Sequence, residues 1–166
     1  MRLNQELPQP NLTTSFQLSS YNAHISDSLL PQNRWDRSFL SYESVDVTLS
    51  YRLMDMVRLY SGGGFLFDQE PSHVKPGTVR FGVDFDSPWI FLGERIAPQI
   101  STEFKMHEEY SWNSDFSLRA GFRFFPTRDD IPAFTFMAEY FKGHSVHGQM
   151  YKSQVEYLGV GLHCKF

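Results

Sequence analysis

Hydrophobic and polar residues alternate along most of this chain with a period of two, which is the period of a β-strand. In the last stretch, Leu158, Val160, Leu162 and Phe166 share one face, and glycine or polar residues occupy the other. No segment of comparable length has a helical period. The sequence therefore predicts an all-β protein with eight alternating segments. They lie near residues 12–20, 39–53, 57–67, 79–86, 96–107, 115–124, 134–140 and 153–166.

The length and the two faces of these segments favour a barrel in a membrane. Several segments have about 9–11 residues or more, which is enough to cross a bilayer at a tilt. An apolar face that persists to a terminal Phe166, with polar residues opposite, suits a strand between lipid and a polar interior. We predict one domain over residues 1–166, an antiparallel up-and-down transmembrane β-barrel of about eight strands. Residues 1–11 are expected to be irregular.

The connections between the segments also divide into two kinds. If Phe166 lies on the periplasmic side, the connections 21–37, 68–77, 107–112 and 142–151 fall on the outer side. On the inner side 53–55 and 126–132 are shorter, whereas 87–95 is not. The 87–95 connection carries Trp89 and Phe91, where an interfacial aromatic belt would lie. Long outer loops and short periplasmic turns are typical of outer-membrane barrels.

Composition narrows the function classes. Aromatic residues make up 16% of the chain and no run approaches the ~20 apolar residues of a membrane helix. The formal net charge is −4 and the basic residues are scattered, so we expect no nucleic-acid partner. The only cysteine, Cys164, excludes an internal disulfide and a cysteine-based metal cluster. We expect no cofactor.

The start of the chain does not carry a signal for export. Residues 1–8 are polar and lack the apolar core of a signal peptide. A protein of the bacterial outer membrane must be exported, so this location requires a leader that is absent from this chain.

Several segments resemble the bacterial outer-membrane family called "domain of unknown function 1207". They are LSYESVDV at 40–47, RLYSGGG at 58–64, FKMHEE at 104–109 with Trp112, SLRAG at 117–121, EYFKGHS at 139–145 with Gly148 and Gln149, and VEYLGVGL at 155–162. The resemblance implies an exported barrel of Gram-negative bacteria and brings no established activity. Family members have more chain upstream, which leaves open a longer barrel of which this is the C-terminal part.

Charged residues of both signs fall on the face predicted to line the interior. They are Asp46, Arg52, Arg58, Arg80, Asp84, Glu103, Lys105, Asp115, Arg119, Arg123 and Glu139. Buried charges must be paired, and the interior of an eight-stranded barrel is narrow enough for side chains to fill it. We therefore expect a salt-bridged plug. A small-solute channel is the alternative if further strands widen the barrel.

The outer loops offer two candidate chemistries, and the spacing of the residues supports neither. Five histidines, His24, His73, His107, His144 and His147, map there, but no pair has a spacing that forces a metal site. Gly143, His144 and Ser145 with Glu139 could be imagined as a hydrolase set. Adjacent residues on a strand point to opposite faces, which argues against it. We predict no enzyme activity.

The last strand suggests a partner. A strand with Tyr157, Gly159, Leu162 and a free terminal Phe166 resembles the signal that the barrel-assembly machinery recognises in known barrels. With membrane lipid, that machinery is the expected partner. The predicted role is structural, binding or transport-related at the cell envelope. A soluble lipocalin-like barrel is a further alternative, because the alternation does not say which face is inside.

Overall fold

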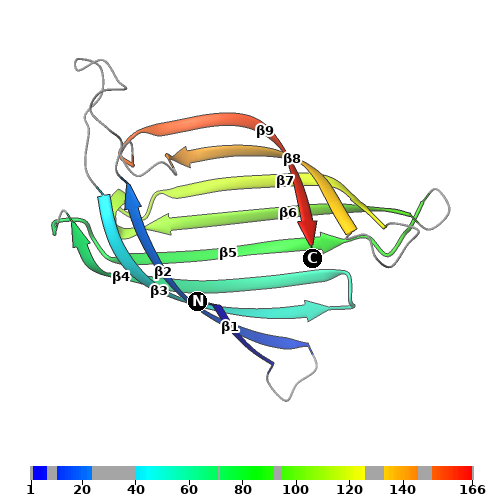
Figure 1. The fold of residues 1–166 in the computed structure, drawn as a ribbon, viewed down its shortest axis with the longest axis horizontal. Helices are drawn as coiled ribbons and strands as arrows, with labels where there is room; N and C mark the ends of the chain where they lie inside the picture. Colours follow the sequence, from blue (N-terminus) through cyan, green and yellow to red (C-terminus); the bar gives the residue numbers. More distant parts are fainter. Residues whose placement is uncertain are drawn as a thin grey trace.

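One antiparallel sheet contains nearly all of the chain that the structure describes (Figure 1). The computed structural model describes residues 2–6, 11–23, 40–70, 72–91, 95–125, 133–145 and 151–165. The strands are β1 (Arg2–Glu6), β2 (Leu12–Ala23), β3 (Leu40–Leu53), β4 (Val57–Glu70), β5 (Gly77–Asp86), β6 (Ile96–His107), β7 (Ser114–Phe124), β8 (Ala133–His144) and β9 (Gln154–Lys165). A short 3-10 helix, η2 (Glu108–Tyr110), follows β6.

The order of the strands follows the chain. Each strand pairs antiparallel with the next, from β1 to β9. The eight predicted up-and-down strands are therefore confirmed, and they correspond to β2–β9. The expectation that residues 1–11 are irregular is wrong for β1, whose residues pair with residues 13–17 of β2. This short polar segment shows no alternation of hydrophobic and polar residues. It can still pair, because strand pairing uses the backbone N–H and C=O groups that nearly every residue carries.

The sheet curls strongly but is not closed. Figure 1 shows β2 and β3 crossing the middle strands at a steep angle, while β9 arches over the sheet from the other edge. Within the described residues, the ladder ends at β1 and β9, and no backbone pairing joins β9 to β1 or β2. The predicted closure into a barrel is therefore not established by the described ladder.

No helix within the described ranges has both the length and the apolar character needed to span a membrane.

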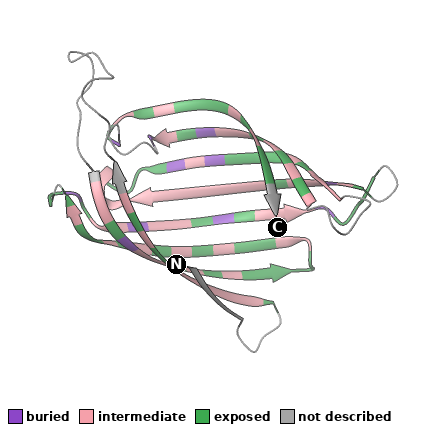
Figure 2. Ribbon diagram, in the orientation of Figure 1, coloured by how far each residue is buried: buried purple, intermediate pink, exposed green. Residues whose placement is uncertain are grey.

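Apolar side chains cover the outside of the curl. On β9, the exposed fractions of Leu158, Val160 and Leu162 are 81%, 76% and 63%. Large hydrophobic residues on the predicted apolar face of β2–β8 are exposed in the same way (Figure 2). They are Leu18, Val47, Leu49, Tyr51, Leu53, Leu59, Phe65, Phe67, Phe81, Val83, Ile100, Leu118, Phe122, Phe134 and Phe136.

Because these side chains point outward, the apolar core is small. The buried hydrophobic residues in the described ranges are Val74, Ala97, Phe141 and Tyr151. Val74 and Tyr151 form one cluster with Tyr42, Leu66 and Tyr110 packed against it, at the end of the sheet where β4, β6 and β8 finish. Polar side chains, not an apolar core, occupy the inside of the curl.

Candidate functional site

Two cavities lie inside the curled sheet. The larger one, which we call the mouth cavity, has a volume of about 530 Å³ and lies at the end where β4, β6 and β8 finish. Residues from all of β2–β9 line it, from Gln17 on β2 to Tyr157 on β9. The smaller deep cavity, of about 380 Å³, is lined by Thr13, Ser50, Arg58 and residues near them. The first and last long strands thus face the same interior space.

Most of the charged residues predicted to face the interior line these cavities. Those that do are Asp46, Arg58, Arg80, Asp84, Glu103, Lys105, Asp115, Arg119 and Glu139. Arg52 and Arg123 do not line either cavity. Arg52 lies exposed at the end of β3, directly opposite Arg58. Arg123 is 3.3 Å from Asp86, a carboxylate outside the predicted set.

The interior charges pair along the sheet. Arg58 and Asp84 are opposite each other on β4 and β5, and Arg58 Nε donates to Asp84 Oδ2 at 2.8 Å. Arg119 and Glu139 are opposite each other on β7 and β8, with Nε to Oε1 at 2.7 Å. In both pairs the two partners come from neighbouring strands. Both cavities remain beside these pairs in the described sheet, and the filling of a closed barrel by side chains stays a prediction.

Polar hydrogen bonds also hold the inward side chains in place. Tyr60 Oη donates to Glu103 Oε2 at 2.9 Å, and Arg80 Nη2 donates to Thr48 Oγ1 at 2.6 Å. A Cβ on Gly64 would lie 2.5 Å from Asp46 Oδ1, so the glycine leaves the space that this carboxylate occupies. Close approach within the glycine run of β4 makes room for a charge inside the curl.

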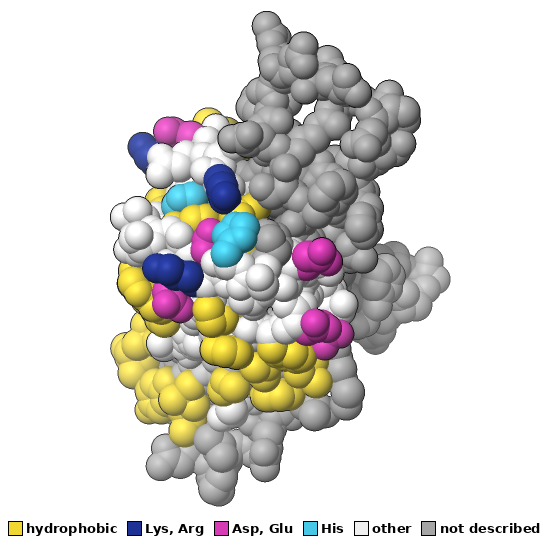
Figure 3. Space-filling model, turned by 90° about the vertical axis from the view of Figure 1, so that its left-hand side faces the viewer, with side chains coloured by type: hydrophobic (Ala, Val, Ile, Leu, Met, Phe, Trp, Pro, Cys, Tyr) yellow, Lys and Arg dark blue, Asp and Glu magenta, His cyan; other side chains and the backbone are white. Residues whose placement is uncertain are grey.

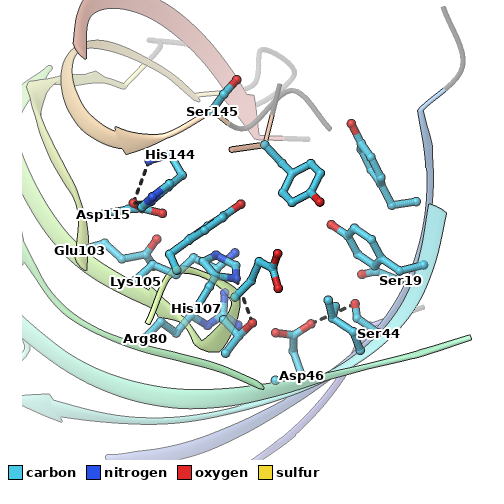
Figure 4. Close-up of a pocket in the computed structure, with 18 of the residues that line it drawn as sticks. Ser19, Ser44, Asp46, Arg80, Glu103, Lys105, His107, Asp115, His144 and Ser145 are labelled. Carbon is cyan, nitrogen blue, oxygen red and sulfur yellow. Dashed lines mark hydrogen bonds and ion pairs between the residues drawn. The ribbon is translucent and has the colours of Figure 1, made fainter. Parts of the chain in front are cut away.

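A buried histidine–carboxylate pair lies at the edge of the mouth cavity (Figure 4). Asp115 Oδ1 is 2.7 Å from His144 Nδ1 and also accepts a hydrogen bond from the His144 backbone N–H at 2.8 Å. The ring of Tyr110 stacks on His144 with centroids 3.6 Å apart, and the His107 ring meets Tyr110 edge-on. Burial, followed by the charges of Asp115 and Glu109, raises the pKa of the Tyr110 hydroxyl above its ordinary value. This hydroxyl therefore stays protonated near neutral pH.

The Asp115–His144 pair does not form a hydrolase-like set with Ser145 and Glu139. His144 and Ser145 both line the mouth cavity, because β8 ends at His144 and strand alternation stops there. Glu139 accepts hydrogen bonds from Arg119 and from Ser117, and His144 is bonded to Asp115 instead. In the described ranges, no three His, Cys, Asp or Glu side chains gather where they could hold a metal ion. His24 and His147 lie outside the described residues.

The mouth cavity also contains a buried hydroxyl that sequence reasoning missed. Tyr151 is 3% exposed and lines the cavity. Its hydroxyl has no hydrogen-bond partner among the described residues. The alternation pattern gave no signal for this residue, because it follows a loop and not a strand.

The end of the molecule near the mouth cavity differs in character from its side. Figure 3 views the end where β4, β6 and β8 finish, and histidine, acidic and basic side chains gather there. Hydrophobic side chains cover the surface below them. The polar interior thus meets the surface at this end.

The residues of the predicted assembly signal are placed in part. Tyr157 points inward and stacks on Phe141, with ring centroids 5.2 Å apart. Gly159 pairs with Glu139, and Leu162 lies exposed on the outer face. Phe166 lies outside the described residues. Their role in assembly stays a prediction.

A family model described as "Protein of unknown function (DUF1207)" matches residues 7–166. No curated protein and no solved structure matches this chain.

Proposed function

Since its model covers nearly the whole chain, this protein belongs to the DUF1207 family, and on this premise we propose that it is a β-barrel protein of the bacterial outer membrane. Its eight long strands close around a polar interior, with β9 meeting β1 where β1 covers the edge of β2. Its role is structural, binding or transport-related at the cell envelope. Membrane lipid surrounds it, and the barrel-assembly machinery recognises its last strand through Tyr157, Gly159, Leu162 and Phe166.

The observation that carries the proposal is the inverted distribution of side chains. Soluble proteins rarely expose a large contiguous apolar surface. Here apolar residues on every one of β2–β9 point outward, whereas salt-bridged charges point inward. Such a surface is stable only against an apolar solvent such as lipid. A soluble lipocalin-like barrel would need the opposite orientation, with its apolar face around the ligand.

Two further features support a barrel in a bilayer. Gln17 on β2 and Tyr157 on β9 line one cavity, so the two sides that must meet in a closed barrel already face the same space. Trp89 and Phe91 are exposed near one end of the sheet, and Trp112 is exposed near the other. Exposed aromatic residues at both ends are typical of the girdles at the two membrane interfaces.

Cysteine labelling tests the proposal. In a Cys164→Ala background, Leu49→Cys and Ser50→Cys place a thiol on the outer and the inner face of β3 at the same depth. In lipid vesicles, a membrane-impermeant maleimide should label Ser50→Cys and spare Leu49→Cys until the vesicles are dissolved and the protein is denatured. Equal labelling of both thiols in intact vesicles would contradict the proposal.

A small-solute channel is the second candidate, and one observation favours it. The mouth cavity and the deep cavity share Arg80, Glu103 and Arg119 among their lining residues. The two spaces therefore adjoin at these charged residues, past which a solute would move.

Conductance measurements separate a channel from a closed barrel. In planar bilayers a channel should give discrete current steps. Arg119→Ser should shift its selectivity toward cations, because it removes a positive charge from the place where the two cavities adjoin. Arg52→Ser, outside both cavities, should leave the selectivity unchanged. A quiet bilayer with correctly inserted protein would exclude the channel and leave the proposed binding or structural role.

A further inference from the structure

The buried hydroxyl of Tyr151 is the starting point for a ligand site. Removing a hydroxyl from water without a hydrogen-bond partner is costly, and most buried polar groups in proteins are paired. Tyr151 is 3% exposed, lines the mouth cavity and has no partner among the described residues. A hydroxyl in this position can donate to, or accept from, a molecule that enters the cavity.

Aromatic rings form two stacked platforms around the same cavity. Tyr21 and Tyr42 stack with ring centroids 5.2 Å apart at 21°, and Tyr110 stacks on His144 at 3.6 Å and 8°. All four side chains line the mouth cavity. Flat aromatic faces bind the C–H faces of a ring-shaped ligand, while their polar edges reach its hydroxyl groups.

The charges around the cavity do not favour a charged ligand. Four basic and five acidic side chains line it. Arg119 and Glu139 neutralise each other, and Asp115 is bonded to His144. Asp46, Arg80 and Lys105 point into the same space (Figure 4) and offer acceptors and donors side by side. This mixture suits a neutral ligand with many hydroxyl groups, each of which both donates and accepts.

From these observations we infer that the mouth cavity binds a small neutral saccharide, which packs on the two stacked platforms and hydrogen-bonds to the Tyr151 hydroxyl. A volume of about 530 Å³ is in the range of small-molecule sites and fits one or two sugar rings. The inference names a ligand class for the proposed role at the cell envelope and rests on that role, because it assumes that the mouth cavity opens to the outside of the cell.

The test is saturation-transfer NMR on the detergent-solubilised chain. The probes are glucose, galactose, mannose, N-acetylglucosamine, maltose and lactose, and inorganic phosphate, followed by the broadening of its phosphorus NMR signal, is the charged comparison. We expect saturable transfer to at least one sugar and no broadening of the phosphate signal. In Tyr151→Phe, the affinity for that sugar should fall about tenfold, the loss expected for one buried hydrogen bond. No saturable binding of any of the six sugars, or preferential binding of phosphate, would overturn the inference.

A matched substitution separates binding from folding. Tyr140 donates to Glu156 and does not line the mouth cavity, so Tyr140→Phe should leave sugar binding unchanged. Tyr151→Phe loses no hydrogen bond within the described protein, so its melting temperature should stay the same or rise. A lower melting temperature together with unchanged binding would assign the hydroxyl a structural role and contradict the inference.

The same samples are first run on gels, boiled and unboiled. Protein whose migration changes on boiling but that binds no sugar overturns the saccharide site and leaves the barrel intact. Protein whose migration does not change on boiling contradicts the proposed barrel itself. The two failures are therefore distinguishable.

Discussion

At the scale of single residues, glycines on the inward face decide where the interior charges lie. A Cβ on Gly64 would displace Asp46, and a Cβ on Gly143 would lie 2.5 Å from Oδ1 of Asp115. The charged side chains therefore lie against the backbone of the neighbouring strand. This arrangement keeps the interior open, because the carboxylates stay beside the wall.

Gly143 provides a test of this packing. Gly143→Ala should lower the free energy of unfolding by about 1–3 kcal/mol, because the new methyl group must push Asp115 away from His144. Gly159→Ala is the matched control, since its Cβ would meet nothing closer than Tyr157 at 3.7 Å. That change should stay within about 0.5 kcal/mol. Urea titration of both variants, followed by tryptophan fluorescence, measures the difference, and equal losses would contradict the packing described.

At the scale of elements, alternation predicted the strands and their faces well. On β3 the exposed apolar residues, such as Leu49, belong to the face that the period of two assigns, and on β9 Leu158, Val160 and Leu162 do so too. Alternation reveals only strands with one apolar face, so the short polar strand β1 was not predicted. Arg58 and Glu139, predicted on the inner face, line the deep and the mouth cavity, but their partners depend on register. Register cannot be read from one strand at a time.

Arginine substitutions on the outer face of the strands test whether β9 contacts lipid. Val160→Arg, near the middle of the strand, should cost about 2–4 kcal/mol of folding free energy in lipid vesicles, because it places a charge at mid-bilayer depth. Leu53→Arg, at the end of β3, should cost about 0–1 kcal/mol, because it lies near an interface. Urea titration of refolding into vesicles measures both. If neither variant differed from the parent chain, the outer face of β9 would not be in contact with lipid.

At the scale of the whole molecule, the candidate site was only partly predictable. Alternation placed Asp115 inside but mapped His144 to a loop, so their contact could not be foreseen. It forms because β7 begins and β8 ends at the same end of the sheet. Tyr151 had no signal at all, since loop residues have no period. The empty space also escaped prediction, because pairing along the wall depends on which strands are neighbours.

The measurement that tests the central claim most directly is a comparison of boiled and unboiled chain on a gel after refolding into detergent or lipid. A closed barrel keeps its compact fold in detergent until it is heated, because its strands leave no unpaired edge. We expect two different migration positions, with the compact form resistant to added protease. A single position in both samples, from protein that is soluble in plain buffer, would contradict the account of an outer-membrane barrel.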